Sequence, residues 1–188
     1  MGKSKSLTAV VDPDIFRPIY VRELLLWFAA NRLYTPKFSN QIRTKYRLIL
    51  KELNLPSSYI SREVVDFRNA FHDAEVKATQ EKIKQYGDPE LDTSICYAVA
   101  DISQADCIIS LQIEKYPQIY TEGNGPRLLS ADEFLLELMK KNQSLFILKW
   151  LALLQLHYSE GFELKSFVDR YQYSGLPMFS EQIRHLFD

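Results

Sequence analysis

Short apolar segments that alternate with helical segments constrain the fold of this chain most strongly. Residues 7–11 read as a buried strand, because they are apolar, partly β-branched, and stopped by the turn formers Asp12, Pro13 and Asp14. Residues 106–110 predict a second buried strand, residues 126–129 predict a third short strand, and residues 34–38 predict a short extended piece. Helices are expected between them, over residues 19–30, 39–53, 58–71, 93–102 and 131–141. This alternation predicts an α/β domain with a short, mostly parallel sheet between helices.

Several helix ends carry recognisable capping signals. Ser39 is a good N-cap for the second helix, and Asp92 or Thr93 is expected to cap the helix that runs to about Ile102. Ser130 and Glu133 have the spacing of a capping box. These signals mark where the predicted helices of the α/β domain begin.

The pattern changes to helix only from residue 142 onward. Residues 144–158 predict a helix that is apolar on nearly every face, followed by two shorter helices at 162–173 and 180–187. A helix that is apolar all round must be buried on several sides. It either caps the domain within the chain or binds a protein partner or a second copy, and both readings stay open. We therefore expect a flexible tail at 1–6, the α/β domain at 7–141, and a C-terminal helical extension at 142–188.

Composition narrows the classes of protein that this chain can be. Its 188 residues suit one domain, and a hydrophobic content of 46% excludes an intrinsically disordered chain. The net charge of −1 does not indicate a strongly basic nucleic-acid binder, although residues 1–87 hold 15 basic and 9 acidic residues and the remainder is acidic. Cys96 and Cys107 lack zinc-site spacing. With no signal peptide and no apolar run of about 20 residues, we expect a cytoplasmic protein without a membrane partner.

The acidic turn after the first strand is the strongest chemical signal. Asp12 and Asp14 follow a strand whose carboxyl end should lie at the edge where parallel α/β sheets place their sites. A second acidic segment, residues 88–92, precedes a predicted helix and can converge on the first. Carboxylate oxygens suit Mg²⁺ or Mn²⁺, which would activate water for attack on a phosphodiester. The plainer interpretation is that these acids are turn formers and caps.

The order of these segments resembles the PIN-domain superfamily of small metal-dependent nucleases. The resemblance covers about residues 7–140 and rests on seven pieces: the strand ending in Val11-Asp12-Pro13-Asp14, Arg22-Glu23-Leu24-Leu25-Leu26, Leu33-Tyr34-Thr35-Pro36, residues 71–76, residues 88–92 leading into the Ala-rich helix 93–103, residues 105–110, and residues 126–138. It implies a PIN-like three-layer fold. It also implies an endoribonuclease that depends on Mg²⁺ or Mn²⁺, with a toxin-type component as one form of that activity.

The acidic set of the family is incomplete in this chain. Asp12 matches the first acid and Asp92 the third, but residues 39–45 contain no acid where the second is usual. Near the fourth position the chain has Gln112 and then Glu114. The resemblance therefore implies catalytic roles for Asp12 and Asp92, and metal ligands at Asp12, Asp14, Asp92 and Glu114. An inactive PIN-like module that binds RNA or a protein partner is the alternative.

A basic set lies on the predicted helix 39–53. Arg43, Arg47 and Lys51 recur every four residues and share one face, and Lys45 lies nearby. These four side chains could contact an RNA backbone through its phosphates, although a solvated helix face explains the same stripe. Arg43 and Lys45 in the region of the missing acid also argue against cation binding there.

A dehalogenase-like phosphatase is a third class, suggested by the Asp-x-Asp pattern at Asp12 and Asp14. Ile15 and Phe16 do not match what that family has after its second acid, so this class is disfavoured. The three histidines are far apart in sequence, and no histidine-based site is expected.

Overall fold

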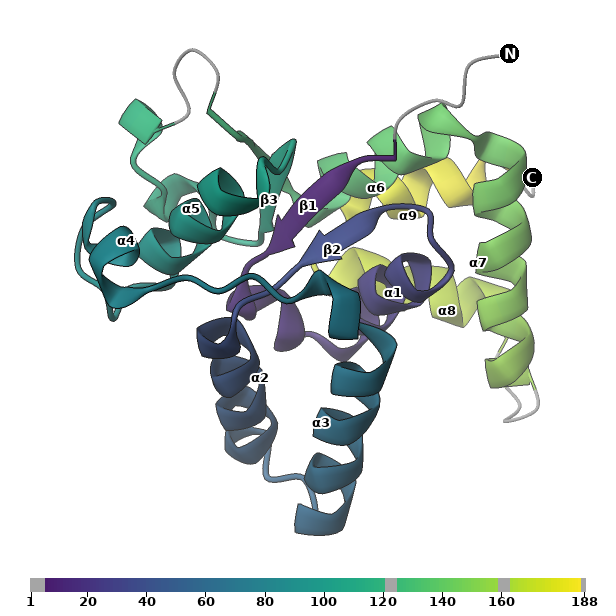
Figure 1. Ribbon diagram of the computed structural model, residues 1–188. Coiled ribbons are helices and arrows are strands. Elements are labelled where there is room, and N and C mark those ends of the chain that lie inside the picture. The colour runs from purple at the N-terminus through teal and green to yellow at the C-terminus, as the bar shows by residue number, and fades with distance from the viewer. Residues whose placement is uncertain (1–5, 121–124, 159–162, 187–188) are drawn as a thin grey trace.

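The fold is built on a parallel four-stranded sheet. The computed structural model describes residues 6–120, 125–158 and 163–186, which excludes most of the predicted tail at 1–6 and the predicted helix ends at 162 and 187. The strands are β1 (Thr8–Val11), β2 (Thr35–Lys37), β3 (Cys107–Ser110) and β4 (Arg127–Ser130), in the order β2-β1-β3-β4 (Figure 1). All the pairings between them are parallel, which confirms the α/β prediction.

The central position of β1 explains why its sequence is apolar throughout. Ala9, Val10 and Val11 are fully buried, since the strand has a neighbour on each edge and helices on both faces. The chain leaves β1 at Asp12, whose N–H donates to the carbonyl of Ile109 in β3 at 2.9 Å. The carboxyl ends of β1 and β3 therefore lie side by side.

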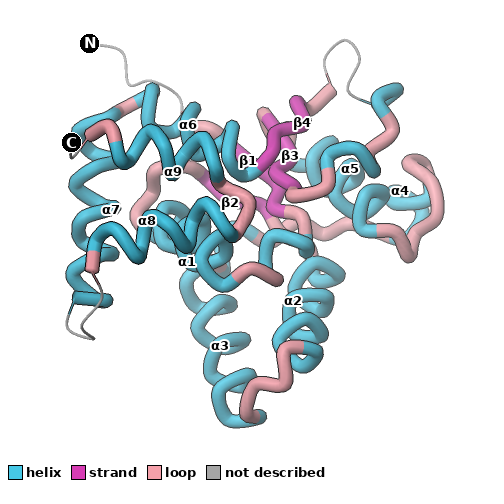
Figure 2. The backbone as a smooth tube through the Cα atoms, turned by 180° about the vertical axis from the view of Figure 1, so that it is seen from behind, coloured by secondary structure: helices cyan, strands magenta, loops and turns pink. Residues whose placement is uncertain are grey.

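The helices form two layers and a projecting pair. Figures 1 and 2 show α4 and α5 on one face of the sheet, and α1, α6 and the C-terminal helices on the other. A hairpin of α2 and α3 extends away from the sheet beyond the carboxyl ends of its strands. The bounds are α1 (Ile19–Ala30), α2 (Asn40–Glu52), α3 (Ser57–Ala70), α4 (Gln80–Lys84), α5 (Asp92–Ser103), α6 (Ala131–Lys141), α7 (Gln143–Tyr158), α8 (Leu164–Tyr173) and α9 (Pro177–Arg184).

The helix caps confirm two sequence predictions and correct a third. Ser39 accepts a hydrogen bond from the N–H of Ile42 at 3.3 Å and begins α2, and Ser130 and Glu133 form the expected capping box of α6. The cap predicted at Asp92 or Thr93 is wrong, because α5 has Leu91 as its N-cap and no side chain accepts from its first turn. The Asp92 carboxylate instead faces a lysine of α2, as described below.

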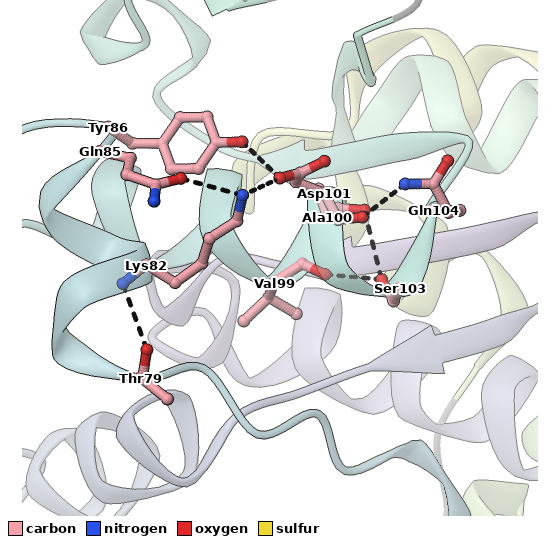
Figure 3. Close-up of polar contacts among 9 residues, drawn as sticks. All are labelled: Thr79, Lys82, Gln85, Tyr86, Val99, Ala100, Asp101, Ser103 and Gln104. Atoms are coloured by element: carbon pink, nitrogen blue, oxygen red, sulfur yellow. Dashed lines mark hydrogen bonds and ion pairs between the residues drawn. The ribbon is translucent and has the colours of Figure 1, made fainter.

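A polar clamp fixes α5 against α4 (Figure 3). Lys82 of α4 forms an ion pair with Asp101 of α5, and the Tyr86 hydroxyl donates to the same carboxylate at 2.8 Å. These two contacts lower the pKa of Asp101, so it stays charged and the clamp persists. The clamp holds the helix whose first turn carries Asp92.

The C-terminal helices cover α1 and α6 and complete one continuous core. Asp132 of α6 accepts the N–H groups of Met178 and Phe179 at 2.9 and 2.7 Å, which anchors the start of α9. Trp27 of α1 donates its indole N–H to the Lys149 carbonyl of α7 at 2.8 Å. The extension therefore acts as an intramolecular cap.

α7 is buried in part within the chain, and burial of its other apolar side chains against a partner or a second copy stays a prediction. Phe146, Trp150 and Leu153 are buried, but Leu148 is 61% exposed and Leu151 is also exposed. Within the described residues α7 packs on α1 and α6, and it also contacts α8 and α9 through Trp150 with Tyr171 and Phe146 with Phe179. No helix within the described residues has the length and apolar character needed to span a membrane.

Candidate functional site

Asp12 lies at the junction of the two central strands. It is only 4% exposed and begins a short 3₁₀ turn at Pro13–Phe16, where its Oδ1 accepts the N–H of Asp14 at 3.0 Å. Pro13 supplies the fixed φ that such a turn favours at its first position. The turn chemistry expected from the sequence is therefore present, and it directs the carboxylate inward.

Tyr116 supplies the second contact to Asp12. Its hydroxyl, which is buried, donates a short hydrogen bond to Asp12 Oδ2. Burial raises the pKa of Tyr116 well above its usual value, so the phenol keeps the proton that it donates. Sequence reasoning missed this role of Tyr116, because the partners are 104 residues apart and no local pattern joins them.

Asp14 ties the end of β1 to the end of β3. Its Oδ2 accepts from the Ser110 hydroxyl at 2.7 Å and from the N–H of Leu111 at 3.0 Å. Its Oδ1 is buried and receives no hydrogen bond from any described residue. An unsatisfied buried carboxylate oxygen is costly, and it points to a group that the site is built to receive.

Asp92 approaches from the first turn of α5 and meets Lys45 of α2. The Lys45 Nζ lies 3.1 Å from Asp92 Oδ1 and donates to the Glu90 carbonyl at 3.2 Å. Lys45 was predicted as part of an RNA-binding stripe, and it lies instead beside the acids. The ion pair joins the projecting hairpin to the acidic edge of the sheet.

The charge of Asp92 acts on the two carboxylates of the turn after β1. Burial, followed by the negative charge of Asp14 and then that of Asp92, raises the pKa of Asp12 to about 7, although the Asp14 N–H and Tyr116 oppose the rise. Burial and the charge of Asp92 also raise the pKa of Asp14. Three of the four predicted metal ligands, Asp12, Asp14 and Asp92, therefore lie at the same edge of the sheet.

Glu114 does not join this cluster. It is exposed on a 3₁₀ turn after β3, and the acids that raise the pKa of Asp12 are Asp14 and Asp92. The expectation of Glu114 as an auxiliary ligand is not supported, because the chain turns it toward solvent while Tyr116 turns inward. Thr44, in the segment where the family has its second acid, donates its hydroxyl to the Asn40 carbonyl at 2.9 Å and is exposed.

The donor set fits one hard cation better than two. Carboxylate oxygens are suitable ligands for Mg²⁺ or Mn²⁺, and the unsatisfied Oδ1 of Asp14 suits a ligand role. Both oxygens of Asp12 already accept hydrogen bonds, however, and Asp92 faces Lys45. Over residues 6–120, 125–158 and 163–186, no three His, Cys, Asp or Glu side chains are grouped closely enough to hold a metal ion as they stand. A bound ion would need a small rearrangement and water ligands.

The predicted basic stripe divides between two surfaces. Arg43 forms an ion pair with Glu75 at 2.9 Å, and Arg43 and Arg47 line a groove of about 240 Å³ between α2 and α3. Lys45 points to the acids, and Lys51 is exposed outside the groove lining. Sequence reasoning missed Arg68 of α3, which lines the same groove; only the pairing of the two helices reveals it.

Comparisons of the chain with protein-family models, with curated proteins and with solved structures returned no match. The resemblance to PIN domains therefore rests on the segments quoted above, and membership of that family is a proposal.

Proposed function

We propose that this chain is a PIN-like endoribonuclease that uses a single divalent cation, Mg²⁺ or Mn²⁺, at the edge where β1 and β3 end. One observation carries the proposal: Asp12 and Asp14 are held on one turn after β1, Asp92 comes from the start of α5, and burial together with the charge of Asp92 raises the pKa of both Asp12 and Asp14. Such a cluster is unfavourable by itself and becomes favourable around a cation. The parallel sheet with helices on both faces agrees with a PIN-like fold.

Each residue has a definite task in this proposal. A bound cation would polarise the phosphate and lower the pKa of a water molecule. Asp12 and Asp14 would hold that ion, and Tyr116 and Ser110 keep the two carboxylates in place through their hydrogen bonds. Lys45, already at the acidic edge, would contact a phosphate oxygen and stabilise the charge that develops during cleavage.

Cleavage of a mixed RNA pool tests this function. The native protein with Mn²⁺ or Mg²⁺ should cut RNA, and EDTA or Asp12→Asn should lower the rate by about a hundredfold or more, since removing a key electrostatic group costs that much in other enzymes. Asp73→Asn is the matched control, because the Asp73 side chain is 91% exposed and is not one of the three clustered acids. Full activity of a folded Asp12→Asn protein would contradict the proposal.

A second candidate function is a non-catalytic PIN-like module that binds RNA or a protein partner. The specific observation in its favour is that all three acids already have partners: Tyr116 on Asp12, Ser110 on one oxygen of Asp14, and Lys45 on Asp92. The Lys45 ammonium would then serve as a built-in cation. A folded protein that neither binds Mn²⁺ nor cuts RNA, but still binds RNA, would favour this function. The toxin-type role and the cytoplasmic location stay predictions.

A further inference from the structure

The groove between α2 and α3 gathers three guanidinium groups. Arg43 and Arg47 come from successive turns of α2, and Arg68 comes from the last turn of α3. Arg43 is held by Glu75 and by the side chain of Asn40. Arg47 and Arg68 are exposed, and neither has an ion pair or hydrogen bond to any residue that the structure describes. Two unpaired positive charges therefore face one groove beside a third that is fixed in place.

The floor of the groove is rigid and aromatic. Tyr46 and Phe67 are buried with their ring centroids 5.1 Å apart, and the Tyr46 hydroxyl donates to Glu63 of α3 at 2.9 Å. These contacts lock the two helices together, so the distance between the arginines of α2 and that of α3 is set by the core of the hairpin. Such a site is preorganised for a ligand, which lowers the entropy cost of binding.

We propose that this groove binds phosphate groups of single-stranded RNA, at a position separate from the acids. The inference rests on the proposed function, because it names where that substrate is held. Guanidinium groups match phosphate oxygens in a two-pronged geometry, and arginine is the residue most suited to that contact. A groove of about 240 Å³ is too small to admit a duplex.

The basic side chains on two sides of α2 favour RNA over an acidic peptide as the ligand. Lys45 faces the acidic edge, whereas Arg43 and Arg47 lie on the opposite side of the same helix, at about 160–200° around its axis for 3.6 residues per turn. One strand that crosses this helix would meet Lys45 at the acids and the arginines in the groove. Its regularly repeated phosphates would supply an anion at each place, separated by a helix diameter of about 10–12 Å.

Binding without metal separates this inference from the cleavage proposal. Fluorescence anisotropy of a short labelled single-stranded RNA in EDTA compares the native protein with the double variant Arg47→Ala/Arg68→Ala. The expected loss in affinity is about tenfold or more. The slope of log K against log salt should become shallower by about 1.4, because each of the two lost phosphate contacts contributes about 0.7. The control is Arg62→Ala/Lys84→Ala, which removes the same charge from exposed positions outside the groove lining.

Each outcome decides the inference. Loss of affinity and slope in the groove variant, with both unchanged in the control, supports it even if Asp12→Asn and native protein are equally inactive. Equal losses in both variants would reduce the effect to bulk charge and overturn it. Native protein that fails to bind RNA, or that binds a labelled poly-glutamate peptide through Arg47 and Arg68 instead, would also overturn it.

Discussion

The acidic edge of the sheet and the basic groove of the hairpin lie on opposite sides of α2, and they treat their charges in opposite ways. Asp12 is buried, and its oxygens are met by Tyr116 and by the backbone of the turn. Arg47 and Arg68 are exposed and lack partners within the described chain. A buried charge without partners lowers the stability of the folded chain, whereas an exposed charge without partners costs little free energy and stays available to a ligand.

This difference couples the two sites differently to folding. Changes at the acidic edge should alter the stability of the metal-free protein, while changes in the groove should alter binding alone. Four measurements of stability therefore test the comparison, and they are ordered here by the size of the expected effect.

The pH dependence of stability should be the largest effect. The pKa of Asp12 is about 7 in the folded protein and 3.8 as its ordinary value, so between these values the unfolded chain has lost a proton that the folded one retains. The free energy of unfolding therefore falls as pH rises from about 4 to about 7, by at most about 1.4 kcal/mol per pH unit for this group. Urea unfolding of metal-free protein across this range measures the slope, and Asp12→Asn should flatten it. A stability that rises across this window because of Asp12 would contradict the burial argument.

Tyr116→Phe should have the next largest effect. The change leaves Asp12 Oδ2 buried without its donor, which should lower the free energy of unfolding by about 1–3 kcal/mol. Chemical denaturation at neutral pH measures this. The control is Tyr173→Phe, at a position that is 88% exposed, and it should leave stability unchanged. Equal effects of the two variants would show that the Tyr116 contact does not support the site.

Lys45→Gln should have a smaller effect on stability and an informative one on cation binding. The ion pair with Asp92 is partly exposed, so its loss should cost less than about 1 kcal/mol. Because the ammonium competes with a cation for Asp92, the variant should bind Mn²⁺ a few times more tightly. Calorimetric titration checks this, and weaker Mn²⁺ binding would mean that Lys45 supports the cation site instead of competing with it.

Arg47→Ala/Arg68→Ala should have the smallest effect on stability. Both side chains are exposed and make no ion pair within the described residues, so the free energy of unfolding should change by no more than about 0.5 kcal/mol. Thermal and urea unfolding measure it. A loss of 2 kcal/mol or more, on the order of a broken buried contact, would mean that these arginines stabilise the hairpin, and the two sites would then not differ in their coupling to folding.

The sequence predicted the elements well because local signals determine them. The apolar run of β1, the Ser39 cap and the capping box at Ser130 each act within a few residues, and each appears where expected. The position of Asp12 and Asp14 beside the carboxyl end of β3 agrees with the rule that the strands of a parallel sheet end at one edge.

The remaining features depend on contacts between distant segments. Tyr116 reaches Asp12 across 104 residues, and Lys45 reaches Asp92 only because α2 packs beside α5. Arg68 joins Arg43 and Arg47 through the pairing of α2 with α3. How much of α7 the chain itself buries depends on distant segments in the same way, since hydrophobicity alone does not state how many surfaces the rest of the fold will offer.

A Mn²⁺ titration of the folded native protein by calorimetry, beside Asp12→Asn, tests the central claim most directly. The converging carboxylates predict one ion bound per chain, with binding lost in Asp12→Asn while RNA affinity in EDTA is retained. A folded native protein that takes up no Mn²⁺ would contradict the claim, and the acidic edge would then be a structural cluster neutralised by Tyr116 and Lys45.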